Sequence, residues 1–115
     1  HVLSVHEGPV NISKSGTRAI EEGMVLSNEP GYYLEGHFGI RIENLVVVCR
    51  SVKNDFLYLD TLTLCPFDRR LIRVELLSSK ERRWLNGYHQ NVFALLSPLL
   101  SSSCQKWLKN ACATL

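Results

Sequence analysis

An arginine and a glutamate alternate with isoleucines in the middle of the chain. Arg41 and Glu43 occupy every second position, and Ile40 and Ile42 lie between them. Because successive side chains of a strand point to opposite faces, the charged pair faces one way and the isoleucines the other. This pattern indicates a strand that lies between an apolar core and a polar cavity. A carboxylate in such a cavity needs a partner, either the neighbouring arginine or a metal ion.

Glu29 is a second carboxylate of this kind. It ends the mainly apolar segment Met24–Glu29 and is followed directly by Pro30-Gly31, a turn that sends the chain back toward Glu43. The hairpin would bring the two glutamates close together, and paired carboxylates offer the oxygen ligands that Mn²⁺ and similar ions prefer. His6, which closes a strand-like segment near the start of the chain, is a third polar group that would reach the same cavity.

Each of these residues also has a simpler explanation. A strand glutamate is most often exposed or half of a salt bridge, so the Arg41–Glu43 pair alone is read as structural. A lone histidine is more often a packing or surface residue than a functional one. The same structural interpretation covers the remaining histidines and the paired tyrosines, which are His1, His37, His89, Tyr32 and Tyr33.

The elements that would position these groups fall in the first part of the chain, where β-branched residues, Gly and Pro are frequent. We expect strands over residues 24–29, 39–50, 56–60 and 61–66, and a loop over 13–22 with one helical turn near Ala19. The apolar run Leu45–Cys49 predicts a segment that is buried on both faces.

From about Leu71 onward the composition changes to charged residues, Leu and Ala, which predicts helices. Ser78 and Glu81 have the spacing of a capping box at a helix start. Leu85, Tyr88 and Val92 then recur at helical spacing. The sequence therefore predicts an α+β protein with a strand-rich region over residues 1–70 and a helical extension over 71–115.

Composition limits the class of protein. The chain has 115 residues, of which 45% are hydrophobic and 21% charged, and a formal net charge of +2. These values are typical of a globular protein, and the scattered basic residues do not predict a nucleic-acid surface. No apolar run approaches the roughly 20 residues of a membrane span. The four cysteines form no C-x-x-C pair, which favours reduced thiols and a cytoplasmic protein.

Three ordered motifs resemble the pita-bread metallopeptidases, and most closely the aminopeptidase P (Xaa-Pro aminopeptidase) branch. They are HEGP at residues 6–9, GMVLSNEPGYY at 23–33 and FGIRIEN at 38–44. TLTLCP at 61–66 and WLNGYH at 84–89 resemble the C-terminally extended form of that enzyme. The resemblance implies a curved antiparallel sheet from the catalytic domain, followed by C-terminal helices.

The resemblance also implies roles for individual residues. Glu29 and Glu43 match two ligands of a pair of divalent ions, with Mn²⁺ expected and Zn²⁺ or Co²⁺ as alternatives. Glu43 would bridge both ions, and Glu29 would also help to take a proton from the attacking water. His6 would bind the scissile carbonyl of the substrate, and Arg41 would orient the carboxylates. The implied substrates are peptides with proline at the second position, and the implied assembly is a homodimer.

Two Asp ligands and the ligand His of that family lie upstream of His6 and have no counterpart in this sequence. We therefore expect a C-terminal fragment that is inactive alone and binds metal weakly or not at all. The alternative is a non-catalytic pita-bread module that acts by binding or by self-association.

Overall fold

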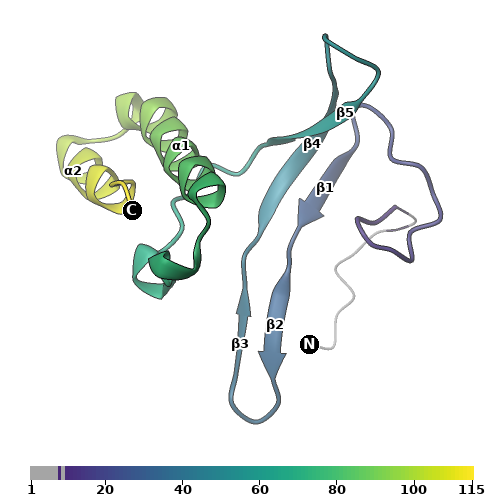
Figure 1. Ribbon diagram of the computed structural model, residues 1–115. Helices are drawn as coiled ribbons and strands as arrows, with labels where there is room; N and C mark the ends of the chain where they lie inside the picture. The colour runs from purple at the N-terminus through teal and green to yellow at the C-terminus, as the bar shows by residue number, and fades with distance from the viewer. Residues whose placement is uncertain (1–7, 9) are drawn as a thin grey trace. The chain divides into compact units, whose positions relative to one another are not determined.

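The computed structural model describes residue 8 and residues 10–115, and the chain divides into two compact units between Thr63 and Leu64 (Figure 1). The N-terminal unit contains the strands and the C-terminal unit the helices, as expected for the predicted α+β class. The observed division precedes residue 70 because Leu64, Phe67 and Ile72 pack against the buried helical cluster of the C-terminal unit. A domain boundary after residue 70 stays a prediction.

Five strands form two antiparallel sheets in the N-terminal unit. Their bounds are β1 (Val25–Asn28), β2 (Gly31–Leu34), β3 (Phe38–Arg41), β4 (Asn44–Arg50) and β5 (Leu57–Thr61). One sheet has the order β1-β4-β5, and β2 pairs with β3 in the other. Figure 1 shows β1 continuing into β2 alongside the chain that runs from β3 into β4.

A single pairing register runs through both sheets. Asn28 pairs with Asn44, and three residues further along Gly31 pairs with Arg41. If the same register is continued between these two pairs, Glu29 lies opposite Glu43 and Pro30 lies opposite Ile42. The backbone N–H of Ile42 donates to the carbonyl of Pro30 at 3.1 Å, which keeps the two chains in register. Because Pro30 has no N–H to donate in return, the predicted strand over 39–50 is interrupted between Arg41 and Asn44.

The central strand β4 is buried on one face and partly open on the other. Val46 and Val48 are 4% and 1% exposed, whereas Leu45 is 46% exposed. The prediction that Leu45–Cys49 is buried on both faces is therefore wrong for the part of the chain that the structure describes. An apolar run alone does not reveal which of its faces another layer covers.

Two further local predictions are wrong. No helical turn forms near Ala19, and the segment after Thr61 makes no separate strand. The Leu62 N–H still donates to the Leu45 carbonyl of β4 at 2.9 Å. At Cys65 the backbone N–H donates to the Tyr88 hydroxyl at 3.3 Å, and the carbonyl accepts from the same hydroxyl at 2.9 Å. Cys65 is thus bonded to a helix and not to a neighbouring strand.

The C-terminal unit is built around a helix pair. Its elements are η1 (Arg69–Leu71), η2 (Val74–Leu76), α1 (Ser79–Leu96), η3 (Ser97–Leu99) and α2 (Ser102–Ala111). The buried cluster consists of Leu85, Tyr88, Val92, Leu108 and Cys112. The predicted capping box is confirmed, because the Ser78 hydroxyl accepts from the Glu81 N–H and the Glu81 carboxylate accepts from the Ser78 N–H. Neither helix, nor any other in the described residues, is both long and apolar enough to cross a membrane.

Candidate metal and catalytic site

Glu29 and Glu43 lie at the centre of the two-stranded ribbon. Since the shared register sets them directly opposite one another, their side chains leave the same face of the ribbon. Directly opposed residues of an antiparallel pair have Cα atoms about 4.5–5.5 Å apart. The two carboxylates can therefore share a divalent cation between them. The described residues contain no group of three or more His, Cys, Asp or Glu side chains suited to a metal ion.

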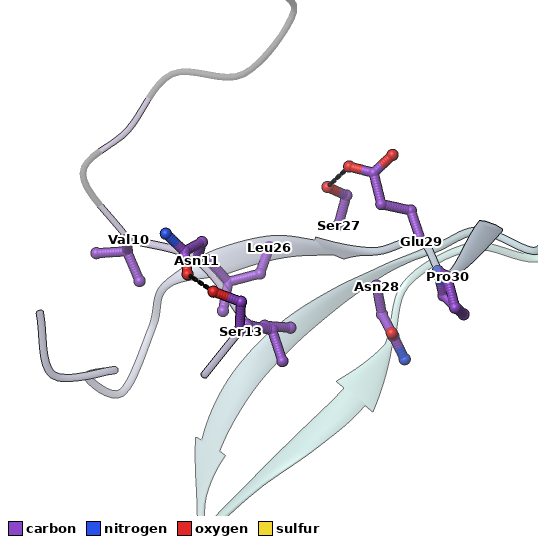
Figure 2. Close-up of a pocket in the computed structure, with 9 residues that line it drawn as sticks. Val10, Asn11, Ser13, Leu26, Ser27, Asn28, Glu29 and Pro30 are labelled. Atoms are coloured by element: carbon purple, nitrogen blue, oxygen red, sulfur yellow. Dashed lines mark hydrogen bonds between the residues drawn. The ribbon is translucent and has the colours of Figure 1, made fainter. Parts of the chain in front are cut away.

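Two side chains hold the carboxylate of Glu29 in place. The Ser27 hydroxyl donates to Oε1 at 2.8 Å, and Nη1 of Arg41 donates to Oε2 (Figure 2 shows the Ser27 contact). The Glu29 side chain is 20% exposed, so this ion pair is partly shielded from solvent. Both carboxylate oxygens thus accept a hydrogen bond, which fixes the orientation of the Glu29 side chain.

Arg41 is itself held by Tyr33. Its Nε donates to the phenol oxygen at 2.8 Å, and its guanidinium carbon lies 5.7 Å from the centroid of the tyrosine ring. The hydrogen bond and charge of the Tyr33 hydroxyl are the main causes that raise the pKa of Arg41, and the carboxylates of Glu29 and Glu43 add to this effect. The arginine thus stays charged between the two acidic groups.

Two glycines make room for the Tyr33 ring. A Cβ at Gly31 would lie 2.8 Å from the ring and its hydroxyl, and a Cβ at Gly39, directly opposite Tyr33, would lie 2.6 Å from it. The ring therefore lies across positions 31 and 39 and reaches Arg41. The interpretation of Tyr33 as a packing residue is incomplete, because its hydroxyl also accepts a hydrogen bond from Arg41. The signal in the sequence is the pair of glycines on its face of the hairpin.

A cavity of about 560 Å³ lies beside Glu29 within the N-terminal unit. One wall is β1 with Glu29 and Pro30, and the other is formed by residues 10–13 (Figure 2). The prediction of a turn at Pro30-Gly31 is wrong, because β1 continues into β2 there and the chain reverses at residues 35–37 instead. The residues that line it are Val10, Asn11, Ile12, Ser13, Leu26, Ser27, Asn28, Glu29 and Pro30.

The structure brings some of the predicted site residues together and does not describe others. Glu29 and Arg41 are in direct contact, and Glu43 is exposed opposite Glu29. The expected ion pair of Arg41 with Glu43 forms with Glu29 instead, because Glu29 is the diagonal neighbour of Arg41 across the ribbon. His6 lies outside the described residues. Ser27, which orients Glu29, was not singled out from the sequence.

Comparison with known proteins gives consistent matches over the whole chain. Residues 55–115 match the C-terminal region of peptidase M24, and residues 2–50 match metallopeptidase family M24. A probable Xaa-Pro aminopeptidase P of Coprinopsis cinerea is 45% identical over 122 residues, which cover 95% of this chain and 19% of that protein. Xaa-Pro aminopeptidase ApepP of Drosophila melanogaster is 40% identical over 120 residues, which cover 93% of this chain and 20% of that protein.

A solved structure is also similar. It is an X-prolyl aminopeptidase from Caenorhabditis elegans, described as a cytosolic enzyme with a di-nuclear active site. The superposition has a TM-score of 0.83 at 35% sequence identity and covers 100% of this chain and 20% of that one. The chain therefore spans about one fifth of the length of the relatives it matches.

Proposed function

Because this chain belongs to metallopeptidase family M24 and has part of its pita-bread fold, we propose that it supplies the C-terminal part of a two-metal aminopeptidase. The proposed reaction is hydrolysis of the bond between an N-terminal residue and a following proline. The observation that carries the proposal is the pair of opposed carboxylates, Glu29 and Glu43, with Arg41 bonded to Glu29.

Glu29 and Glu43 would hold two divalent ions together with ligands from outside this chain. Their oxygen donors favour Mn²⁺, with Zn²⁺ or Co²⁺ as alternatives. Ions of this kind lower the pKa of a bound water and polarise a carbonyl group.

The protein groups would then act as follows. Ser27 and Arg41 keep the Glu29 carboxylate in one orientation, so that it can take the proton of the attacking water. Arg41 also offsets the repulsion between two carboxylates at close range. His6 would donate a hydrogen bond to the scissile carbonyl as negative charge develops on its oxygen.

Peptide hydrolysis by the full-length protein tests this proposal. We expect turnover of a peptide with proline at the second position and none of its alanine counterpart. Glu43→Gln should lower kcat/KM at least about 100-fold, because it removes one charge from a metal-binding carboxylate. Glu75→Gln is the matched control, since Glu75 forms an exposed ion pair with Arg73 in the C-terminal unit. Full activity of Glu43→Gln would reject the assignment, and an inactive wild-type protein would favour the non-catalytic alternative.

We further propose a cytoplasmic homodimer. All four cysteines are free, which suits a reducing compartment. Leu99 and Trp107 are 80% and 64% exposed in the C-terminal unit and offer apolar surface for a second copy. Light scattering of the full-length protein tests the dimer, and a monomer at micromolar concentration would reject it.

A further inference from the structure

The segment that follows β5 places a threonine hydroxyl against the start of β4. The N–H of Leu45 donates to Oγ1 of Thr63 at 2.8 Å, and the carbonyl of Leu45 accepts from the N–H of Leu62 at 2.9 Å. The last residue of β5 is Thr61, which pairs with Val46. The Thr63 side chain therefore extends the attachment of β4 by one residue toward Glu43.

Glu43 lies between two main-chain positions that are held from opposite edges. On one side the N–H of Ile42 donates to the carbonyl of Pro30 at 3.1 Å. On the other side Leu45 is held by Thr63 from the edge along which β5 runs. Successive residues of a strand direct their main-chain groups to alternate edges, so these two attachments act in opposite directions. Together they fix the direction in which the side chain of Glu43 leaves the ribbon.

A metal-binding carboxylate depends on a main chain that does not shift. Functional sites are held within about 0.5 Å of their working geometry by the groups around them. Groups that contact a metal ligand directly typically contribute 10- to 100-fold to metal affinity. Thr63 contacts the main chain two residues from Glu43, so its contribution should be that of a single hydrogen bond.

We propose that Thr63 is a positioning residue for the metal site, acting through Leu45 on the main chain of Glu43. Its hydroxyl keeps Glu43 in the place from which the carboxylate opposes Glu29. The proposal rests on the metalloaminopeptidase function proposed above. Thr63 is also the last residue of the N-terminal unit, so the segment that leads into the helical extension contributes to the metal site.

Binding of Mn²⁺ to the metal-free full-length protein tests this role. Thr63→Val keeps the β-branched shape of the side chain but removes the acceptor for the Leu45 N–H. Loss of one hydrogen bond should weaken the Kd for Mn²⁺, measured by calorimetry, about 5- to 10-fold. Thr63→Ser keeps the hydroxyl and should bind Mn²⁺ as tightly as the unmodified protein.

Thr61→Val is the matched control. Thr61 lies two residues away at the end of β5, and its hydroxyl makes no hydrogen bond with any described residue. Thermal denaturation of each metal-free variant separates positioning from a purely structural contribution. A Thr63→Val protein that melts earlier but binds Mn²⁺ normally would overturn the proposal, and so would an equal loss of affinity in Thr61→Val.

The serine variant keeps the test decisive if Thr63→Val does not fold. A 5- to 10-fold loss of affinity in Thr63→Ser would show that the hydroxyl is not the group that acts, and would overturn the positioning role. All of these outcomes leave the metalloaminopeptidase function intact. Failure of the unmodified full-length protein to bind Mn²⁺ would instead overturn the proposed metal site, and the role of Thr63 with it.

Discussion

The guanidinium of Arg41 joins the Glu29 carboxylate to the Tyr33 phenol. Lysine at this position would keep the charge, but its single ammonium nitrogen could not replace Nε and Nη1, which donate to the two groups in fixed directions. Groups that orient metal-binding side chains typically contribute 10- to 100-fold to activity or metal affinity. We therefore predict that Arg41→Lys lowers kcat/KM of the full-length protein by about this factor, measured on a proline-containing peptide.

Arg50→Lys is the control for this substitution. Arg50 also pairs with a glutamate of the N-terminal unit, Glu22, at 3.0 Å, but both side chains are more than half exposed. Exposed ion pairs of this kind contribute little. Equal activity of the two variants would contradict an orienting role of Arg41.

His89 makes the stability of the C-terminal unit depend on pH. Its ring is fully buried, Nε2 accepts from the Phe67 N–H at 3.1 Å, and Nδ1 has no hydrogen-bond partner among the described residues. Burial, and then the positive charge of Arg69, lowers the pKa of His89 from its ordinary value of 6.5. The unfolded chain therefore takes up a proton near pH 6.5 while the folded chain does not, and the free energy of unfolding falls below that pH.

We predict that the urea midpoint of the C-terminal unit is constant between pH 8 and 7.5 and decreases from pH 7 to pH 5.5. Tryptophan fluorescence reports on this unit alone, because Trp84 and Trp107 both lie in it. The pKa values of Asp68, Glu75 and Glu81 are lowered, so these carboxylates stay ionised over this range. A midpoint that does not change with pH would show that His89 can be protonated in the folded state.

At the scale of residues, alternation along one strand was enough to select Arg41 and Glu43. The partner of Arg41 was not predictable in this way, because the contact with Glu29 depends on the register between two strands. Tyr33 was missed for the same reason. Its role depends on the absence of side chains at Gly31 and Gly39, on its own strand and on the partner strand.

At the scale of elements, the start of α1 depends on the Ser78 capping box. Ser78→Ala removes the acceptor for the Glu81 N–H, and we predict a loss of about 1 kcal/mol in the free energy of unfolding. Ser101→Ala is the control, because Ser101 precedes α2 without making a side-chain capping bond. Urea denaturation followed by tryptophan fluorescence measures both variants. A loss at Ser101 as large as that at Ser78 would contradict the capping role.

The capping box was predictable because both of its residues lie within one turn of the chain. The interruption of the strand predicted over residues 39–50 was not predictable, since its cause is Pro30, which lies across the ribbon between β1 and β2. The open face of β4 was missed because burial is decided by what lies over the strand. Local signals thus identified the ends of elements better than the faces that the elements bury.

At the scale of the whole molecule, the ordered motifs were enough to identify the family. They could not reveal the other ligands of the proposed metal site, because the proposal places those ligands outside this chain. The chain spans about one fifth of the length of its relatives, and its described residues set two carboxylates, Glu29 and Glu43, opposite one another beside Arg41. Two carboxylates, one already bonded to a guanidinium, leave most of the coordination sphere of Mn²⁺ to water. Arg41 also reduces the net negative charge that would attract the cation.

We therefore predict that the isolated 115-residue chain binds Mn²⁺ no more tightly than millimolar and does not hydrolyse proline-containing peptides. Calorimetric titration of the chain with Mn²⁺ measures the affinity, and Glu43→Gln in the same chain reports any contribution of the opposed carboxylates. Arg41→Met should increase the weak affinity, because it releases Glu29 from its ion pair and restores the repulsion that a cation relieves. Micromolar binding by the unmodified chain would contradict this prediction, because it would mean that two carboxylates and water suffice to hold the cation.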